Sequence, residues 1–110
     1  PQASAAEAAA TESSPPAGQD PGDARAELGL IARMHTALQQ AKPKSVLALC
    51  VEHERRWPHG TFAQERQGLR AVAACRVGAV GAGALARAFL VSYPRGPLAA
   101  RVRDACGAAP

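Results

Sequence analysis

Cys50 and His53 are the two residues of this chain best placed for chemistry, because they lie three positions apart and would share one face of a helix. A thiol beside an imidazole can act as a nucleophile with its base, but that role needs a third group that orients the imidazole. A zinc site would need two further ligands, for which the candidates are His35, His59 and Cys75. The sequence has no closely paired ligands of the kind found in structural zinc sites. We therefore predict no catalytic residue and no metal site, and we interpret the pair as packing residues.

The carboxylates do not suggest an acid–base pair either. Glu52, Glu54 and Glu65 are scattered among arginines, as charges on a solvated helix face usually are. The sequence also lacks a glycine-rich phosphate loop and any recognisable cofactor motif. We predict that the protein is not an enzyme and uses neither a cofactor nor a small-molecule substrate.

The charge of the chain is unevenly distributed. The 110 residues carry 13 Lys+Arg and 9 Asp+Glu, a formal net charge of +4. Residues 25–110 contain all 13 bases and only five of the acids, so this body has a net charge of +8. Arg66 and Arg70 are one turn apart and form a local patch, but the other arginines fall on different predicted elements. The positive charge makes a basic nucleic-acid-binding or regulatory accessory domain one possible function. Because the arginines are dispersed, we treat it as the alternative to a domain that binds another protein.

The first 22 residues contain no Leu, Ile, Val or aromatic residue. Such a segment cannot bury enough apolar surface to offset the conformational entropy that ordering costs. We predict a disordered, acidic linker rich in Pro, Ala and Ser over residues 1–23, a helical domain over residues 24–107 and a tail over residues 108–110. The linker is either a free tail or a spacer from an upstream segment such as a membrane anchor. Nothing in the 110 residues has the 18 consecutive apolar residues that a membrane span needs.

Apolar residues recur at helical spacing in five segments, which are bounded by residues that start or stop helices. Asp23 is a candidate N-cap for the first, and Pro43 suits the first turn of the second. Thr61 and Gln64 form a capping box before the third, and Gly107 suits the end of the fifth. No segment alternates apolar and polar residues as a strand does. We predict an all-α fold with helices over residues 24–40, 43–57, 61–77, 82–93 and 97–106.

An aromatic–Pro–x–Gly turn occurs twice. Residues 57–63 read WPHGTFA and residues 93–99 read YPRGPLA, an offset of 36 residues that also places Leu49 on Leu85. Proline lacks the N–H that would continue a helix, so each turn ends one helix and lets its aromatic ring fold back over the helix pair. The repeat predicts two helix pairs, with a structural role for six turn residues: Trp57, Pro58, Gly60, Tyr93, Pro94 and Gly96.

The segment LALCVEHERRWPHGTFA, which ends at Ala63, resembles a tetratricopeptide repeat. It is most similar to the repeats of BamD-like outer-membrane assembly lipoproteins, in which the second helix of a pair ends in an aromatic–Pro turn. The resemblance covers about residues 27–106. It implies two antiparallel helix pairs followed by a short C-terminal capping helix over residues 97–106.

The resemblance also implies a function. Proteins with such repeats act as scaffolds or adaptors, here on the periplasmic side of a bacterial cell envelope, tethered through the linker; a cytoplasmic location is the alternative. The first helix of each pair would line a concave groove for another protein, for which an acidic partner is one candidate. Membrane attachment would occur only through an upstream anchor. The groove residues would be Arg33, His35, Gln39, Arg66 and Arg70.

The three cysteines leave the disulfide pattern open. One bridge and one free thiol would suit an oxidising compartment. The 36-residue offset aligns Cys106 with Arg70, however, five positions before Cys75. Five residues of helix span about 7.5 Å, which makes a bridge between Cys75 and Cys106 difficult. We therefore expect three buried free thiols.

Overall fold

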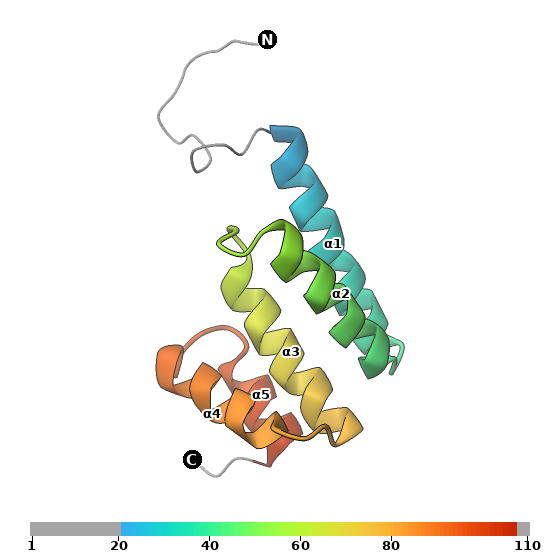
Figure 1. Cartoon of the computed structure of the whole chain (residues 1–110). Coiled ribbons are helices and arrows are strands. Elements are labelled where there is room, and N and C mark those ends of the chain that lie inside the picture. The colour runs from blue at the N-terminus through green and yellow to red at the C-terminus, as the bar shows by residue number, and fades with distance from the viewer. Residues whose placement is uncertain (1–20, 108–110) are drawn as a thin grey trace.

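The structure is a computed structural model that describes residues 21–107. These residues form five α-helices and no strand (Figure 1): α1 (Pro21–Gln39), α2 (Pro43–Arg56), α3 (Ala63–Val77), α4 (Ala82–Ser92) and α5 (Ala99–Cys106). The predicted all-α class with five helices is confirmed. Residues 1–20 and 108–110 lie outside the described range, so the disorder predicted for the linker there, like the C-terminal tail, stays a prediction.

Helix α3 is the centre of the domain, because it contacts each of the other four helices. In Figure 1, α1 and α2 lie on one side of α3, and α4 and α5 lie on the other. The sequence of α3 allows this close packing, since most of its buried residues are small or β-branched. A Cβ added at Gly68 would lie only 2.7 Å from the side chain of Leu98. Glycine at this position therefore lets the segment before α5 approach the α3 backbone.

A single hydrophobic core runs through the described helices. Met34 of α1, Val46 of α2 and Leu69 of α3 are fully buried in it. Val102 of α5 is also fully buried, and α4 contributes Phe89, which is 4% exposed. Because both helix pairs share these contacts, the five helices form one folding unit.

The two aromatic–Pro turns have the same backbone conformation. Trp57 has φ −136° and ψ 69°, and Tyr93 has φ −135° and ψ 60°. Each turn is closed by equivalent hydrogen bonds, in which the glycine N–H donates to the aromatic residue's carbonyl over 3.1 Å. The glycines Gly60 and Gly96 are also sterically required, because a Cβ at either would press against a polar side chain of a preceding helix, Glu27 or Gln64. The 36-residue repeat is thus present in the backbone of both turns.

Several helix ends differ from the sequence-based predictions. Helix α1 begins at Pro21, so Asp23 lies inside its first turn and is not the N-cap. The capping box predicted for Thr61 and Gln64 is wrong: the N-cap of α3 is Phe62, and no side chain of the turn caps the helix.

Helix α5 begins at Ala99 instead of Pro97. Gly107 does end α5, in the left-handed conformation with φ +63°.

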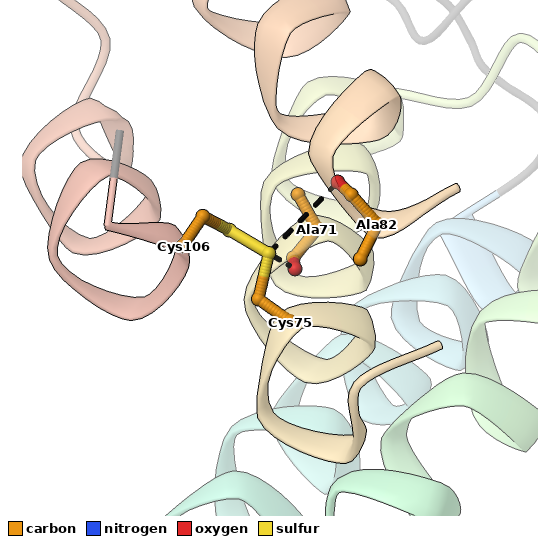
Figure 2. The surroundings of a disulfide bond; sticks show 4 residues. All are labelled: Ala71, Cys75, Ala82 and Cys106. Atoms are coloured by element: carbon orange, nitrogen blue, oxygen red, sulfur yellow. Dashed lines mark hydrogen bonds between the residues drawn. A yellow bond between two sulfur atoms is a disulfide. The ribbon is translucent and has the colours of Figure 1, made fainter. Parts of the chain in front are cut away.

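The expectation of three free thiols is wrong. Cys75 of α3 and Cys106 of α5 form a disulfide, with an S–S distance of 2.08 Å and a Cα–Cα distance of 5.1 Å. Figure 2 shows the bridge between the two helices, where Cys106 Sγ lies 3.6 Å from the Ala71 carbonyl oxygen and Cys75 Sγ lies 3.9 Å from that of Ala82. Cys50 is the free cysteine, and it is buried.

The error in the cysteine prediction lies in the register. The 36-residue offset identifies equivalent positions in two repeats, but neighbouring helices meet at a different offset. Gly68 approaches Leu98, and Cys75 bonds to Cys106, at separations of 30 and 31 residues. Residues that face one another between α3 and α5 are therefore about five positions closer in sequence than residues that are equivalent in the repeat. This difference, about one and a half helical turns, brings the two cysteines together.

Candidate functional site

A buried polar network joins the first three helices. Glu27 of α1 and His53 of α2 are 0% exposed, and Arg66 of α3 is 6% exposed. The Nε2 atom of His53 lies 3.0 Å from Oε2 of Glu27, and its Nδ1 atom lies 3.1 Å from Nη1 of Arg66. The imidazole thus stands between a carboxylate and a guanidinium. Because buried charges are costly unless they are paired, the three side chains depend on one another.

The two partners of His53 determine its protonation. An arginine only donates hydrogen bonds, so Nδ1 must accept from Arg66, and Nε2 must carry the proton that it donates to Glu27. This is the neutral imidazole. Burial lowers the pKa of His53 below its ordinary value; the hydrogen bond to Glu27 opposes this shift, and the charge of Arg66 adds to it.

The same network fixes the Trp57 turn. Arg66 Nη1 donates to the Trp57 carbonyl oxygen over 3.1 Å, and the Trp57 indole N–H donates to Oδ2 of Asp23 over 2.9 Å. The Trp57 ring is 6% exposed and lies 5.4 Å, between ring centroids, from His53. The guanidinium of Arg56 lies 4.2 Å from the centroid of the Trp57 ring, within cation–π range. The aromatic ring therefore packs over the seam between α1 and α2.

Glu27 also caps α3. The backbone N–H of Phe62, the N-cap residue, donates to Glu27 Oε2 over 3.0 Å. A carboxylate at a helix N-terminus is favourable, because it pairs with unsatisfied N–H groups and with the positive end of the helix dipole. A side chain from α1 thus fixes the start of α3.

Next to the start of α3 lies a surface cavity of about 380 Å³. Its apolar lining comes from Phe62, Phe89, Pro97 and Leu98. Its polar lining comes from His35, Thr61, Gln64 and Glu65. His35 Nε2 and Glu65 Oε2 form a half-exposed pair that joins α1 to α3. We call this the α3 cavity; both repeat turns contribute to it, so the repeat geometry determines its shape.

A second, more open hollow of about 300 Å³ lies between α1 and α2. Arg33 and Lys42 contribute its two positive charges. The neutral residues that line it are Thr36, Ala37, Gln40, Ser45 and Leu49. We call this the α1–α2 hollow.

The five residues predicted to form one groove do not line one common cavity among the two described for residues 21–107. His35 lines the α3 cavity and Arg33 lines the α1–α2 hollow, whereas Gln39 and Arg70 are exposed and line neither of them. The expectation that Arg66 is an exposed groove residue is wrong. Its guanidinium is buried because α3 is covered on more than one face and because Glu27 and His53 provide its neighbours.

Sequence reasoning missed Glu27 and Glu65 as site residues. Glu27 lies three and four positions before Leu30 and Ile31, on the buried stripe of α1. A carboxylate at such a position is the available signal, because an acidic residue on an apolar stripe needs a buried partner. No comparable signal marks Glu65, whose partner His35 is on another helix.

The thiol of Cys50 and the imidazole of His53 are not hydrogen-bonded to each other. Cys50 is buried, and burial raises the pKa of its thiol to about 11. Its Sγ atom lies 3.9 Å from Met34 Sδ and 3.8 Å from the Arg66 carbonyl oxygen. Both ring nitrogens of His53 are already bonded within the network. In residues 21–107, no three side chains of His, Cys, Asp or Glu lie together as a metal site would need.

None of the described helices combines the length and apolar character needed to cross a membrane. No protein-family model, curated protein or solved structure matches the chain.

Proposed function

We propose that this chain is a non-catalytic docking module with tetratricopeptide-like repeats, which binds a segment of another protein in the α3 cavity. The repeat supports this proposal beyond the turns themselves. His53 and Trp57 have ring centroids 5.4 Å apart at an angle of 44°, and Phe89 and Tyr93, 36 residues later, have centroids 5.3 Å apart at 48°. The same ring contact thus recurs at the end of the second helix of each pair, as expected of repeat scaffolds, which present binding surfaces between stacked units.

The observation that carries the proposal is the composition of the α3 cavity. Its apolar lining includes two aromatic rings, and its polar residues lie on α1, on α3 and in the turn between α2 and α3. Well-formed pockets of this kind accept a large apolar side chain that serves as the anchor of a partner. The buried network holds the start of α3, which keeps the cavity preformed and reduces the entropy lost on binding.

The charge of the cavity indicates the chemistry of the partner. Glu65 is its acidic residue, and no Lys or Arg lines it. The expected acidic partner depended on Arg66 and Arg70 in the groove, and neither of them lines this cavity. We therefore propose a partner segment with an apolar anchor side chain next to a lysine or arginine, which would pair with the carboxylate of Glu65.

The cysteines support a location in an oxidising compartment. A disulfide between two structural helices is common in the bacterial periplasm and rare in the cytosol. We propose that the domain functions on the periplasmic side of a bacterial envelope, as part of a scaffold or adaptor protein.

Two glutamines on α3 provide a matched crosslinking experiment. Gln64 lines the α3 cavity, whereas Gln67, three residues later, is exposed and does not line it. A photoreactive benzoylphenylalanine at Gln64 should crosslink a partner in living cells, and the same group at Gln67 should not. The proposal is wrong if both positions give the same adducts.

The partner identified at Gln64 then allows a charge test. Glu65→Gln should weaken its binding about tenfold, the loss of one charge-assisted contact, and should reduce the dependence of binding on salt. Glu54→Gln is the control, because Glu54 is an exposed acid on α2 outside the cavity. An equal effect of both substitutions would indicate a general charge effect and would exclude Glu65 as the contact.

A further inference from the structure

The α1–α2 hollow is positively charged, and its two cations have no side-chain partner in the described part of the chain. No salt bridge or hydrogen bond from the side chain of Arg33 or Lys42 occurs within residues 21–107. Both residues are exposed at the edge of the hollow. This differs from Arg66, whose charge is satisfied inside the protein. The two cations of the hollow are therefore available to a ligand.

The sequence around the hollow contains no compensating acid. Between Glu27 and Glu52 the chain has no Asp or Glu. The chain contains two lysines, Lys42 and Lys44, and both lie in this stretch, on either side of Pro43. No acidic residue of the segment 28–51 therefore offsets the positive potential at the hollow.

The turn between α1 and α2 places Lys42 at the hollow. The Lys42 N–H donates to the Ala37 carbonyl oxygen over 2.9 Å, and Ala41 has a positive φ of 58°. These features fold the chain back over the C-terminal end of α1. Arg33 and Thr36 lie in the last two turns of that helix. The cation from the turn and the cation from the helix therefore border the same space.

We propose that the α1–α2 hollow binds a dianionic phosphate group, as in inorganic phosphate or a phosphate monoester. Arg33 can donate two parallel hydrogen bonds to phosphate oxygens, and Lys42 adds a compact point charge. Three neutral side chains supply further donors for the remaining oxygens: Thr36, Gln40 and Ser45. Two cations and three neutral donors suit a doubly charged tetrahedral anion better than a carboxylate, which has one charge and two oxygens.

The test is a titration of the isotope-labelled protein with inorganic phosphate, followed by amide NMR at a constant ionic strength of about 0.15 M. We expect saturable shifts at the amides of the hollow, with its lining residues moving together. Absence of saturable shifts at millimolar phosphate would overturn the proposal. Shifts of equal size at arginines over the whole surface would also overturn it, because they would indicate a diffuse ion atmosphere.

Two double variants remove the same charge from different places. Arg33→Gln with Lys42→Gln should weaken phosphate binding at least about tenfold. Arg87→Gln with Arg101→Gln should leave binding nearly unchanged, because these residues are exposed and do not line the hollow. All four side chains are exposed, so each variant should keep the circular dichroism spectrum and denaturation midpoint of the unmodified protein. An equal loss of binding in both variants would contradict the proposal.

Vesicles distinguish the source of the phosphate. Sedimentation with phosphatidic acid vesicles, but not with phosphatidylcholine vesicles, and its loss in the Arg33/Lys42 variant would identify a lipid headgroup as the ligand. Phosphate binding without vesicle binding would indicate a soluble phosphate compound. Binding of duplex DNA without binding of inorganic phosphate would overturn the proposal and would favour a nucleic-acid interface.

Discussion

The carboxylate of Glu27 and the imidazole of His53 lie 3.0 Å apart, and both side chains are fully buried although neither is apolar. Arg66 completes this arrangement from the third helix, so removal of one member leaves a buried polar group without its partner. The network therefore stabilises the junction of α1, α2 and α3.

Arg66 and Arg70 should respond very differently to the same substitution. Arg66→Ser should lower the free energy of unfolding by about 3–5 kcal/mol, the cost of leaving one member of a buried charged network unpaired. Arg70→Ser should hardly change it, because Arg70 is exposed. Chemical denaturation of both variants gives the comparison. Equal midpoints would show that the buried guanidinium does not contribute to stability.

The stability of the domain should decrease in acid because of His53. Its lowered pKa means that the folded protein resists a proton that the unfolded chain accepts at about pH 6.5. The contribution of His53 is therefore complete above pH 6.5 and is lost as the pH falls from there through the lowered folded-state pKa. NMR titration of the His53 imidazole checks this. Titration of His53 at or above the ordinary pKa would contradict the neutral assignment.

Because Cys75 and Cys106 are bonded, Cys50 should be the one cysteine of the protein with a free thiol. Alkylation of the unfolded, unreduced protein should modify one of its three cysteines, and alkylation after reduction should modify all three. In the folded protein Cys50 should react slowly, because it is buried and its thiolate is disfavoured. Recovery of three reactive thiols before reduction would show that Cys75 and Cys106 are not bonded.

Loss of the disulfide should reduce stability. Its two cysteines are 31 residues apart, and closing a loop of that length contributes about 3–4 kcal/mol in the chain-entropy account. The variant Cys75→Ser with Cys106→Ser should show this loss in urea denaturation without a reductant. Dithiothreitol should destabilise the unmodified protein to the same degree and should not affect the double variant. A reductant effect in the double variant would point to a cause other than this bridge.

Ala41 should be a position at which glycine stabilises the protein. Its φ of 58° lies in the left-handed region, which costs a non-glycine residue about 1 kcal/mol or more. Ala41→Gly should therefore raise the melting temperature. Ala32→Gly, at an exposed position inside α1, should lower it, because glycine weakens helix interiors. Changes of the same sign in both variants would mean that the turn is not strained at Ala41.

Local signals in the sequence were sufficient for the helices. Pro43 opens α2, Gly107 ends α5, and the apolar spacing between such residues identifies the helical segments. These features act over a few residues, so they can be recognised without knowledge of the fold. The same holds for the two aromatic–Pro turns, which the sequence presents as a repeat.

The polar network depended on tertiary information that the sequence does not contain. Periodicity assigns one buried stripe to a helix, but α3 is covered by helices on several sides, so Arg66 lies inside as well as Leu69. Its two partners come from other helices, and no spacing along the chain connects them. The position of Cys106 beside Cys75 depends in the same way on the stacking of two helices.

The α3 cavity is formed by two parts of the domain. Acid would destabilise one of them, and a reducing agent would destabilise the other. The part with His35 and Phe62 depends on a buried network that a proton at His53 would disturb. The part with Pro97 and Leu98 precedes α5, which the disulfide joins to α3. A proton does not affect this bond, but a thiol reductant would break it. Acid and reducing agent should therefore open the cavity from opposite sides, and a bound partner segment that spans both parts would protect the domain against each of them.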